Sequence, residues 1–397
     1  MSSTDAPHTA AVPGAAPPQG PRLSPGESAR TVRLPGLGLV VRSRTSPRPD
    51  APPALYVHGL GGSSQNWSAL MAALGDRVDG RAVDLPGFGH SPPPDDGNYS
   101  IAGHARAVIR LLEAEPRGPV HLVGNSMGGA VSVKVAAARP DLVRTLTLIS
   151  PALPEVPPQR TALPTGLISV PGIPALYLRA TRNWPTERRT RELLALCYGD
   201  PSVVGEQARA EAVAEYQRRI GLPYFWDVMV RSTRGIVDAY TLGGQHSLWR
   251  QAERVLAPTL LVYGGRDKLV SVKVARRASR AFRDSRLLVI PGSGHVAMME
   301  HPELVARAFR DLLAETADRP ERTDTAVRTD TPAQRTDTAV RTDIPDTAAR
   351  TDPAVRTGIA DAPAGTDQGA REDPGAGSGP GGGDRGTGPA GASATGS

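Results

Sequence analysis

Residues 120–129 read VHLVGNSMGG, an apolar run followed by the pattern G-x-S-x-G. The apolar run predicts a buried β-strand, and the small residues after it predict a sharp turn into a helix. On such a turn the hydroxyl of Ser126 stands at the end of a parallel sheet, where it can attack a carbonyl carbon. Gly124 and Gly128 have no Cβ atom, so strand and helix can approach closely and Ser126 can adopt a strained backbone. Ser126 is therefore predicted to be a nucleophile.

Two apolar runs further along the chain are each followed by a residue that can assist a serine nucleophile. Residues 258–262 precede a short loop that carries Asp267, and residues 286–290 precede a glycine-containing loop that carries His295. An imidazole can take a serine proton near neutral pH. A carboxylate can hold that imidazole in the correct tautomer and stabilise its charged form. The sequence thus predicts His295 as the base and Asp267 as the acid that orients it.

Two other acidic residues near His295 are alternatives to Asp267. Asp284 precedes the strand that leads to His295, in a polar turn. Glu300 follows His295 but falls in the last predicted helix. Because neither residue lies in a loop directly after a strand, Asp267 is the predicted partner of His295.

A developing oxyanion needs two backbone N–H donors. The residue after the nucleophile, Met127, is predicted to supply one. The other is predicted to come from Leu60, in the glycine loop GLGG at residues 59–62 that follows an apolar strand. His58, directly before this loop, is expected to anchor it by hydrogen bonding and not to take part in the chemistry.

With these motifs the chain resembles the α/β-hydrolase family over about residues 30–315. The matching segments are HGLGG (58–62), DLPGFGHS (84–91), GNSMGG (124–129), GRD (265–267) and GH (294–295). The order nucleophile, acid, base along the chain is also that of this family. The resemblance implies a mostly parallel sheet with helices on both faces and a helical cap inserted between two core strands.

Within that family, the motifs GNSMGG and Asn66-Trp67 look most like those of the C–C bond hydrolases that act on ring-cleavage products. Many esterases share these motifs. Those C–C hydrolases usually have a tryptophan after the catalytic histidine, where this chain has Val296. Epoxide hydrolases and haloalkane dehalogenases of the fold use an aspartate nucleophile, so Ser126 argues against both.

The composition changes along the chain predict five parts. They are a disordered N-terminal segment (1–30), a first core part (31–150), a helical cap (151–251), a second core part (252–315) and a disordered low-complexity tail (316–397). The tail repeats Arg-Thr-Asp at irregular intervals and then becomes rich in glycine, a composition that cannot build a packed core.

The predicted cap holds nine of the sixteen aromatic residues of the chain. A single aromatic side chain there more often packs helices together than contacts a ligand. Taken together, they predict an apolar substrate site that excludes water. The residues expected to line it are Asn66, Trp67, Phe88, Trp184, Phe225, Trp226 and Val296.

The formal net charge of the 397 residues is +6, and residues 316–397 carry nine arginines against thirteen acidic residues, so the excess of positive charge lies in residues 1–315. Only three lysines occur, which indicates a compositional bias toward arginine. No arginine cluster alternates with aromatic residues, so nucleic-acid binding is not expected.

The single cysteine, Cys197, is expected to be a small core residue; it permits no intrachain disulfide and favours a cytoplasmic location. No signal peptide and no apolar stretch of about 18 residues is present, so stable membrane anchoring is not expected. Neither a metal-ligand spacing nor a dinucleotide-binding motif occurs, and no cofactor is predicted. The oligomeric state is left open.

These residues predict a serine hydrolase that cleaves a carboxylic ester of an apolar small molecule through an acyl-enzyme. A C–C bond hydrolase, a cofactor-free perhydrolase or haloperoxidase, and an acyltransferase would use the same three residues. A hydrolase fold that only binds a ligand in its cap is the alternative from a different class.

Overall fold

The computed structural model describes residues 20–241 and 243–317. The predicted disordered tail therefore lies outside the described residues, apart from its first two positions, as do residues 1–19 of the predicted N-terminal segment. Within the described part, eight strands form one sheet in the order β1-β2-β4-β3-β5-β6-β7-β8. They are β1 (Ser28–Leu34), β2 (Leu37–Arg44), β3 (Pro53–Val57), β4 (Asp79–Val83), β5 (Val120–Asn125), β6 (Val143–Ile149), β7 (Thr259–Gly264) and β8 (Ser285–Ile290).

In the sheet order, the strands from β4 to β8 pair in the parallel sense, whereas β2 pairs in the antiparallel sense with both of its neighbours, β1 and β4. β1 begins at Ser28, three residues before the expected start of the core. The reason is that its full length pairs with β2, from Ser28 opposite Ser43 onward. Arg42 of β2 also forms a buried ion pair with Glu27, which holds the chain just before β1.

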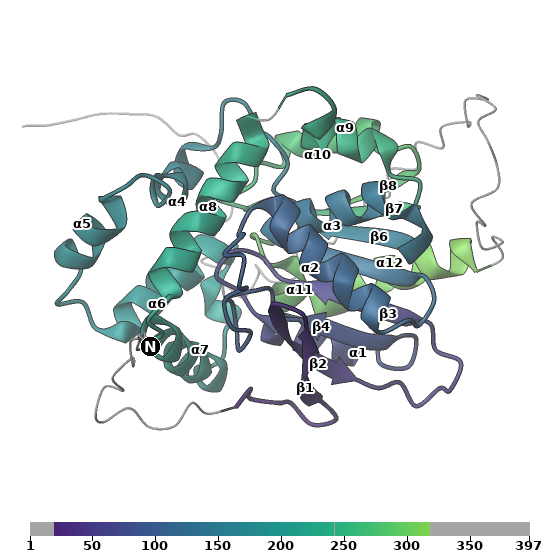
Figure 1. Ribbon diagram of the computed structural model, residues 1–397, viewed down its shortest axis with the longest axis horizontal. Helices are drawn as coiled ribbons and strands as arrows, with labels where there is room; N and C mark the ends of the chain where they lie inside the picture. Colours follow the sequence, from purple (N-terminus) through teal and green to yellow (C-terminus); the bar gives the residue numbers. More distant parts are fainter. Residues whose placement is uncertain (1–19, 242, 318–397) are drawn as a thin grey trace, which may run out of the picture. The chain divides into compact units, whose positions relative to one another are not determined.

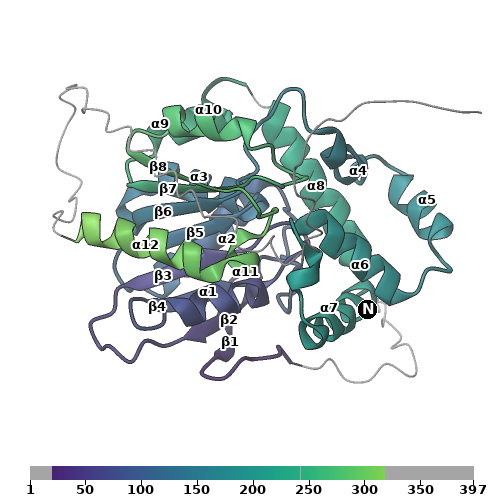
Figure 2. The same cartoon turned by 180° about the vertical axis from the view of Figure 1, so that it is seen from behind.

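Helices cover both faces of the sheet because each central strand buries both of its faces. In β3, Leu55 and Val57 join one apolar cluster, and Ala54 and Tyr56 join the other. Figure 1 shows the first face with its covering helices in front, and Figure 2 shows the second. The first face carries α2 (Ile101–Ala114), α3 (Met127–Ala138), α9 (Leu248–Arg254) and α10 (Lys273–Ala281), and the second carries α1 (Ser68–Ala73), α11 (Ala297–Glu300) and α12 (Pro302–Thr316).

The chain between β6 and β7 leaves the sheet and forms a helical insertion beside the carboxyl ends of the strands (Figure 1). It contains α4 (Leu163–Leu167), α5 (Ile173–Ala180), α6 (Thr186–Cys197), α7 (Glu206–Ile220) and α8 (Phe225–Thr241). These five helices are called the cap below.

The expected end of the cap at residue 251 falls inside α9, which belongs with the core. Leu248, Trp249 and Ala252 are buried in the same apolar cluster as α3. The Trp249 indole also donates a hydrogen bond to the carbonyl of Pro154, at 3.1 Å. Trp249, which the sequence assigned to the cap, is thus part of the core.

Candidate active site

Ser126 lies on the turn between β5 and α3, with φ 53° and ψ −118°. Such a backbone is strained for a residue with a side chain. The neighbouring glycines make the turn possible, because a Cβ atom on Gly128 would lie 2.2 Å from the carbonyl oxygen of Val57. A Cβ atom on Gly124 would lie 2.5 Å from the carbonyl oxygen of Gly128. The turn predicted from the sequence is thus present, and it leaves Ser126 half-buried at the sheet edge.

Asp267 and His295 follow the neighbouring strands β7 and β8, and their side chains form a buried pair. His295 Nδ1 donates to Asp267 Oδ2 at 2.9 Å, which leaves Nε2 as the basic nitrogen. The other carboxylate oxygen of Asp267 accepts hydrogen bonds from the backbone N–H groups of Leu269 and Val270, at 2.8 and 2.9 Å.

These contacts keep Asp267 ionised. Burial alone raises the pKa of Asp267, but the charge of His295 and the hydrogen bonds from His295 and Val270 lower it by more, so the pKa lies below its ordinary value. An ionised carboxylate at this position can stabilise the imidazolium that forms during the reaction. Among the described residues, the His295 ring has its hydrogen bond to Asp267 and none to Ser126. A hydrogen bond between the catalytic base and the nucleophile often forms only when substrate binds.

Asn125, the last residue of β5, connects the nucleophile turn to the histidine loop. Its Nδ2 donates to the carbonyl oxygens of Ile149 and His295, both at 3.0 Å. One side chain therefore fixes the ends of β5 and β6 and the backbone of His295 at the same point. We did not predict this role from the sequence, where the only signal was the position of an amide residue next to Ser126.

The histidine loop is also bound to the cap through Glu300. Glu300 Oε1 accepts from the backbone N–H of Gly294 at 2.7 Å and from the Ser293 hydroxyl at 3.2 Å. Its Oε2 accepts from the N–H of Gly199, just after α6, at 2.8 Å. Glu300, weighed from the sequence only as an alternative acid, is thus a clamp on the His295 loop and does not contact the imidazole.

Replacing Glu300 with alanine should lower kcat by about 10- to 100-fold, because a catalytic group displaced by about 1 Å loses activity on that scale. KM should change little, since Glu300 has no contact with the Ser126 side of the site. Steady-state kinetics on a soluble ester measures the effect, with exposed Glu303 replaced by alanine as the control. Equal kcat in Glu300→Ala and Glu303→Ala would show that the clamp does not position the base.

The glycine loop at residues 59–62 lies against the nucleophile turn. A Cβ atom on Gly59 would be 3.1 Å from the Cβ of Ser126, so the backbone of the loop passes close to the serine. The N–H of Leu60 comes from this loop, and the N–H of Met127 from the first residue of α3. Arg219 of α7 donates to the carbonyl oxygen of Gly61, which ties the loop to the cap.

His58 anchors this glycine loop through hydrogen bonds of its two ring nitrogens. Its Nε2 accepts from the backbone N–H of Leu85 at 3.0 Å, so Nδ1 carries the proton, 2.7 Å from the carbonyl oxygen of Gly59. Burial lowers the pKa of His58, which favours this neutral form. The structural role expected for His58 agrees with these contacts.

Several of the expected pocket residues occupy other surroundings than predicted. Trp67 is fully buried against Tyr56, with ring centroids 5.3 Å apart, in the cluster under the second face of the sheet. A side chain without exposed surface cannot line a pocket, so Trp67 is a core residue. Val296 is buried in the same cluster. Phe88 packs edge-on against the ring of His58 in the opposite cluster.

Three of the remaining expected pocket residues, Trp184, Phe225 and Trp226, lie in the cap, and Asn66 lies between β3 and α1. Phe225 and Trp226 at the start of α8 contact each other, and Trp226 also contacts Tyr177 of α5. The guanidinium of Arg188 stacks on Trp184. The side chain of Asn66 accepts from the N–H of Ser63 at 2.9 Å and closes the turn at the start of a short helix.

Asp284, the other alternative acid, lies at the opposite edge of the sheet from His295. It precedes β8 and pairs with Arg286 at 2.6 Å, whereas His295 follows the carboxyl end of the same strand. Only Asp267 of the three acids considered contacts the imidazole.

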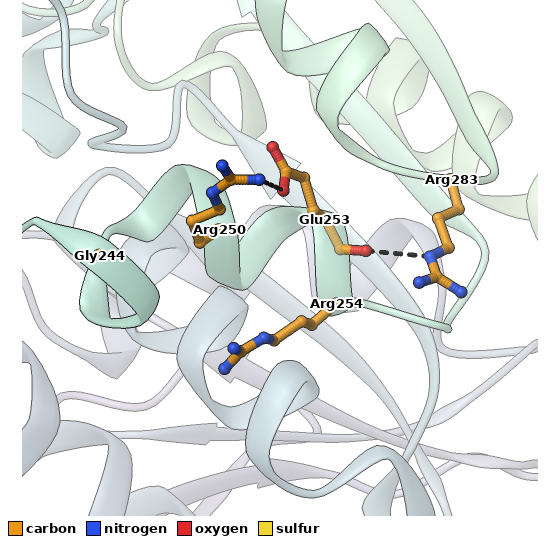
Figure 3. A pocket seen from close by; sticks show the side chains of 5 residues that line it. All are labelled: Gly244, Arg250, Glu253, Arg254 and Arg283. Atoms are coloured by element: carbon orange, nitrogen blue, oxygen red, sulfur yellow. Dashed lines mark hydrogen bonds and ion pairs between the residues drawn. The ribbon is translucent and has the colours of Figure 1, made fainter. Parts of the chain in front are cut away.

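A surface hollow of about 440 Å³ lies beside α9, and Figure 3 shows the side chains around it. It is lined by Gly244, Arg250, Glu253, Arg254 and Arg283. Glu253 pairs with Arg250, and its carbonyl oxygen accepts from Arg283 Nε at 3.0 Å. The hollow contains none of the residues around Ser126 and is separate from the candidate site.

No helix in residues 20–241 or 243–317 combines the length and the apolar character that are needed to cross a bilayer.

Comparisons with known proteins identify relatives of the chain. Esterase Rv0045c of Mycobacterium tuberculosis is 26% identical over 266 residues, which cover 66% of this chain and 83% of that protein. The dihydrolipoyllysine-residue acetyltransferase component of the acetoin cleaving system of Pseudomonas putida is 29% identical over 261 residues. This match covers 64% of the chain and 61% of the relative, so the chain spans less than two thirds of that protein.

A solved structure with the same fold is a meta-cleavage product hydrolase from Pseudomonas fluorescens. The two structures align over 72% of this chain and 97% of the hydrolase, with a TM-score of 0.59 and 19% sequence identity. The family described as alpha/beta hydrolase fold matches residues 52–302, which include Ser126, Asp267 and His295. The chain belongs to the α/β-hydrolase fold family.

Proposed function

We propose that this chain is a serine hydrolase that cleaves a carboxylic ester with an apolar acyl or alcohol part. Ser126 is the nucleophile, His295 the general base, and Asp267 the acid that orients it. The observation that carries the proposal is the buried His295–Asp267 pair beside a serine on a strained turn. Asn125, the residue before this serine, donates a hydrogen bond to the backbone carbonyl oxygen of His295. The esterase from Mycobacterium tuberculosis supports an ester as the substrate.

In the proposed reaction, His295 Nε2 takes the proton of the Ser126 hydroxyl as Oγ forms a bond to the ester carbonyl carbon. The N–H groups of Leu60 and Met127 stabilise the oxyanion. The C–O bond to the alcohol then breaks, and the alcohol leaves with the proton from His295. In the second half, His295 deprotonates water as it attacks the acyl carbon. The bond to Ser126 Oγ then breaks, Oγ takes the proton back from His295, and the acid leaves.

The apolar character of the substrate rests on the aromatic residues of the cap. Tyr177 and Trp226 contact each other across α5 and α8, and Phe225 packs against Trp226. Such residues favour apolar groups and exclude water, which strengthens hydrogen bonds to the oxyanion. The oxyanion loop and the histidine loop are both bound to the cap, through Arg219 and Glu300, so the cap is part of the site.

The test is to label the full chain with a fluorophosphonate probe and to locate the adduct by mass spectrometry. Trypsin releases residues 118–134 as one peptide, and its fragments distinguish Ser126 from Ser132, which is fully buried. Labelling at Ser126 together with loss of ester turnover supports the proposal. p-Nitrophenyl esters from acetyl to dodecanoyl then measure the length of the pocket.

Two results would replace this proposal. A folded chain that takes no label and binds an apolar ligand would be a binding protein. A labelled chain that cleaves a vinylogous diketone of the ring-cleavage type, but none of the esters, would be a C–C bond hydrolase.

A further inference from the structure

The exposed apolar side chains of the chain are concentrated in the outer part of the cap. Of the eleven large apolar side chains that are exposed in the described part of the chain, six lie between residues 156 and 177. They are Val156, Leu163, Leu167, Val170, Leu176 and Tyr177. Single exposed apolar residues are ordinary, but their concentration in one segment of the chain indicates a surface that contacts a partner or a lipid.

The two helices of this segment have little of their own to stabilise them. α4 has five residues, none of them buried, and α5 has eight. Helices this short are marginal in water unless one face is covered. Figures 1 and 2 both place α5 at the edge of the cap away from the sheet, so its outer side is not covered by the described core.

The charges in this segment are all of one sign. Residues 156–186 contain no aspartate or glutamate, and they contain Arg160, Arg179 and Arg182. All three arginines are exposed. None of them takes part in the ion pairs found among the described residues. Apolar side chains next to unpaired arginines are the combination that binds the headgroup region of an anionic bilayer.

We infer that residues 156–186, the docking segment, bind reversibly to the surface of an anionic lipid bilayer. Leu163, Leu167 and Leu176 enter the boundary between headgroups and acyl chains, and the arginines contact lipid phosphates. The segment is fixed to the core beside the candidate site. Gln159 donates to the carbonyl oxygen of Asp267 at 3.3 Å, and Thr161 donates to that of Lys268. Docking would therefore bring the site to the bilayer surface.

Sedimentation with vesicles tests this inference on the full chain. The wild type should co-sediment with phosphatidylglycerol vesicles and much less with phosphatidylcholine vesicles, and binding should weaken with salt. The double variant Leu167→Ser/Leu176→Ser should lower the partition coefficient by at least about tenfold, because two apolar side chains no longer enter the bilayer. Arg179→Gln/Arg182→Gln should remove the preference for the anionic lipid.

The matched control is Leu23→Ser/Val203→Ser, which removes two exposed apolar side chains outside the segment and should bind as the wild type does. Equal melting temperatures exclude misfolding as the cause of a loss. The inference is overturned if the wild type stays in the supernatant with both vesicles, or if Leu167→Ser/Leu176→Ser binds like the control. A concentration-dependent dimer without lipid, lost in Leu167→Ser/Leu176→Ser, would assign the surface to a second copy of the chain instead.

Discussion

Replacing Ser126 with alanine should lower kcat/KM for a soluble ester by about 10⁴- to 10⁶-fold, the loss that follows removal of the nucleophile from a serine hydrolase. The variant keeps the loop around Leu60 and the His295–Asp267 pair, so it should still bind the substrate. The backbone strain at φ 53° is the same for alanine, and the melting temperature should stay near that of the wild type. Hydrolysis rates and substrate binding by calorimetry measure the two effects.

Ser132 provides the matched control for this substitution. It lies in α3, six residues after Ser126, and its buried hydroxyl has no hydrogen-bond partner among the described residues. Ser132→Ala should therefore keep full activity. If Ser126→Ala retained the activity of Ser132→Ala, Ser126 would have no part in the reaction.

Replacing Asp267 with asparagine should lower kcat by about 10⁴-fold. The amide keeps the size of the carboxylate but removes the negative charge beside His295, and its NH2 group can donate to the imidazole and favour the wrong tautomer. The hydrogen bonds from Leu269 and Val270 can persist to the amide oxygen, so the fold should be retained. The effect belongs in kcat, since Asp267 is buried behind His295.

The control for Asp267→Asn is Asp284→Asn, which removes a carboxylate at the far end of β8. Its kcat should equal that of the wild type. A loss in Asp284→Asn that matches the loss in Asp267→Asn would point to the net charge of this region and not to an oriented imidazole.

The central elements of the fold could be predicted because local sequence determines them. The nucleophile turn needs glycine at 124 and 128, and the helix that starts after Ser100 begins with a side-chain cap that accepts from Gly103 N–H at 3.0 Å. The order of Ser126, Asp267 and His295 along the chain follows from the strands that precede them. Each of these signals is contained in a few consecutive residues, so a single sequence shows it.

The contacts that join distant segments could not be predicted in the same way. Asn125 and Glu300 are single polar residues whose partners lie far along the chain or are backbone atoms, which carry no sequence signal. Trp67 follows the glycine loop in sequence, yet the start of α1 turns its indole into the core. The end of the cap was misplaced because α9 has the same apolar spacing whether it packs on a cap helix or on α3.

The glycines at 199 and 294 set a condition on exchanging the cap between relatives. At this point two backbones touch: a Cβ atom on Gly199 would lie 2.3 Å from the carbonyl oxygen of Gly292, and one on Gly294 would lie 2.4 Å from the nitrogen of Gly199. The carbonyl of Cys197 also accepts from the N–H of His295 at 2.7 Å. A chimera that takes its cap from another hydrolase to change specificity must therefore retain this glycine crossing, or the graft will displace the base along with the old pocket.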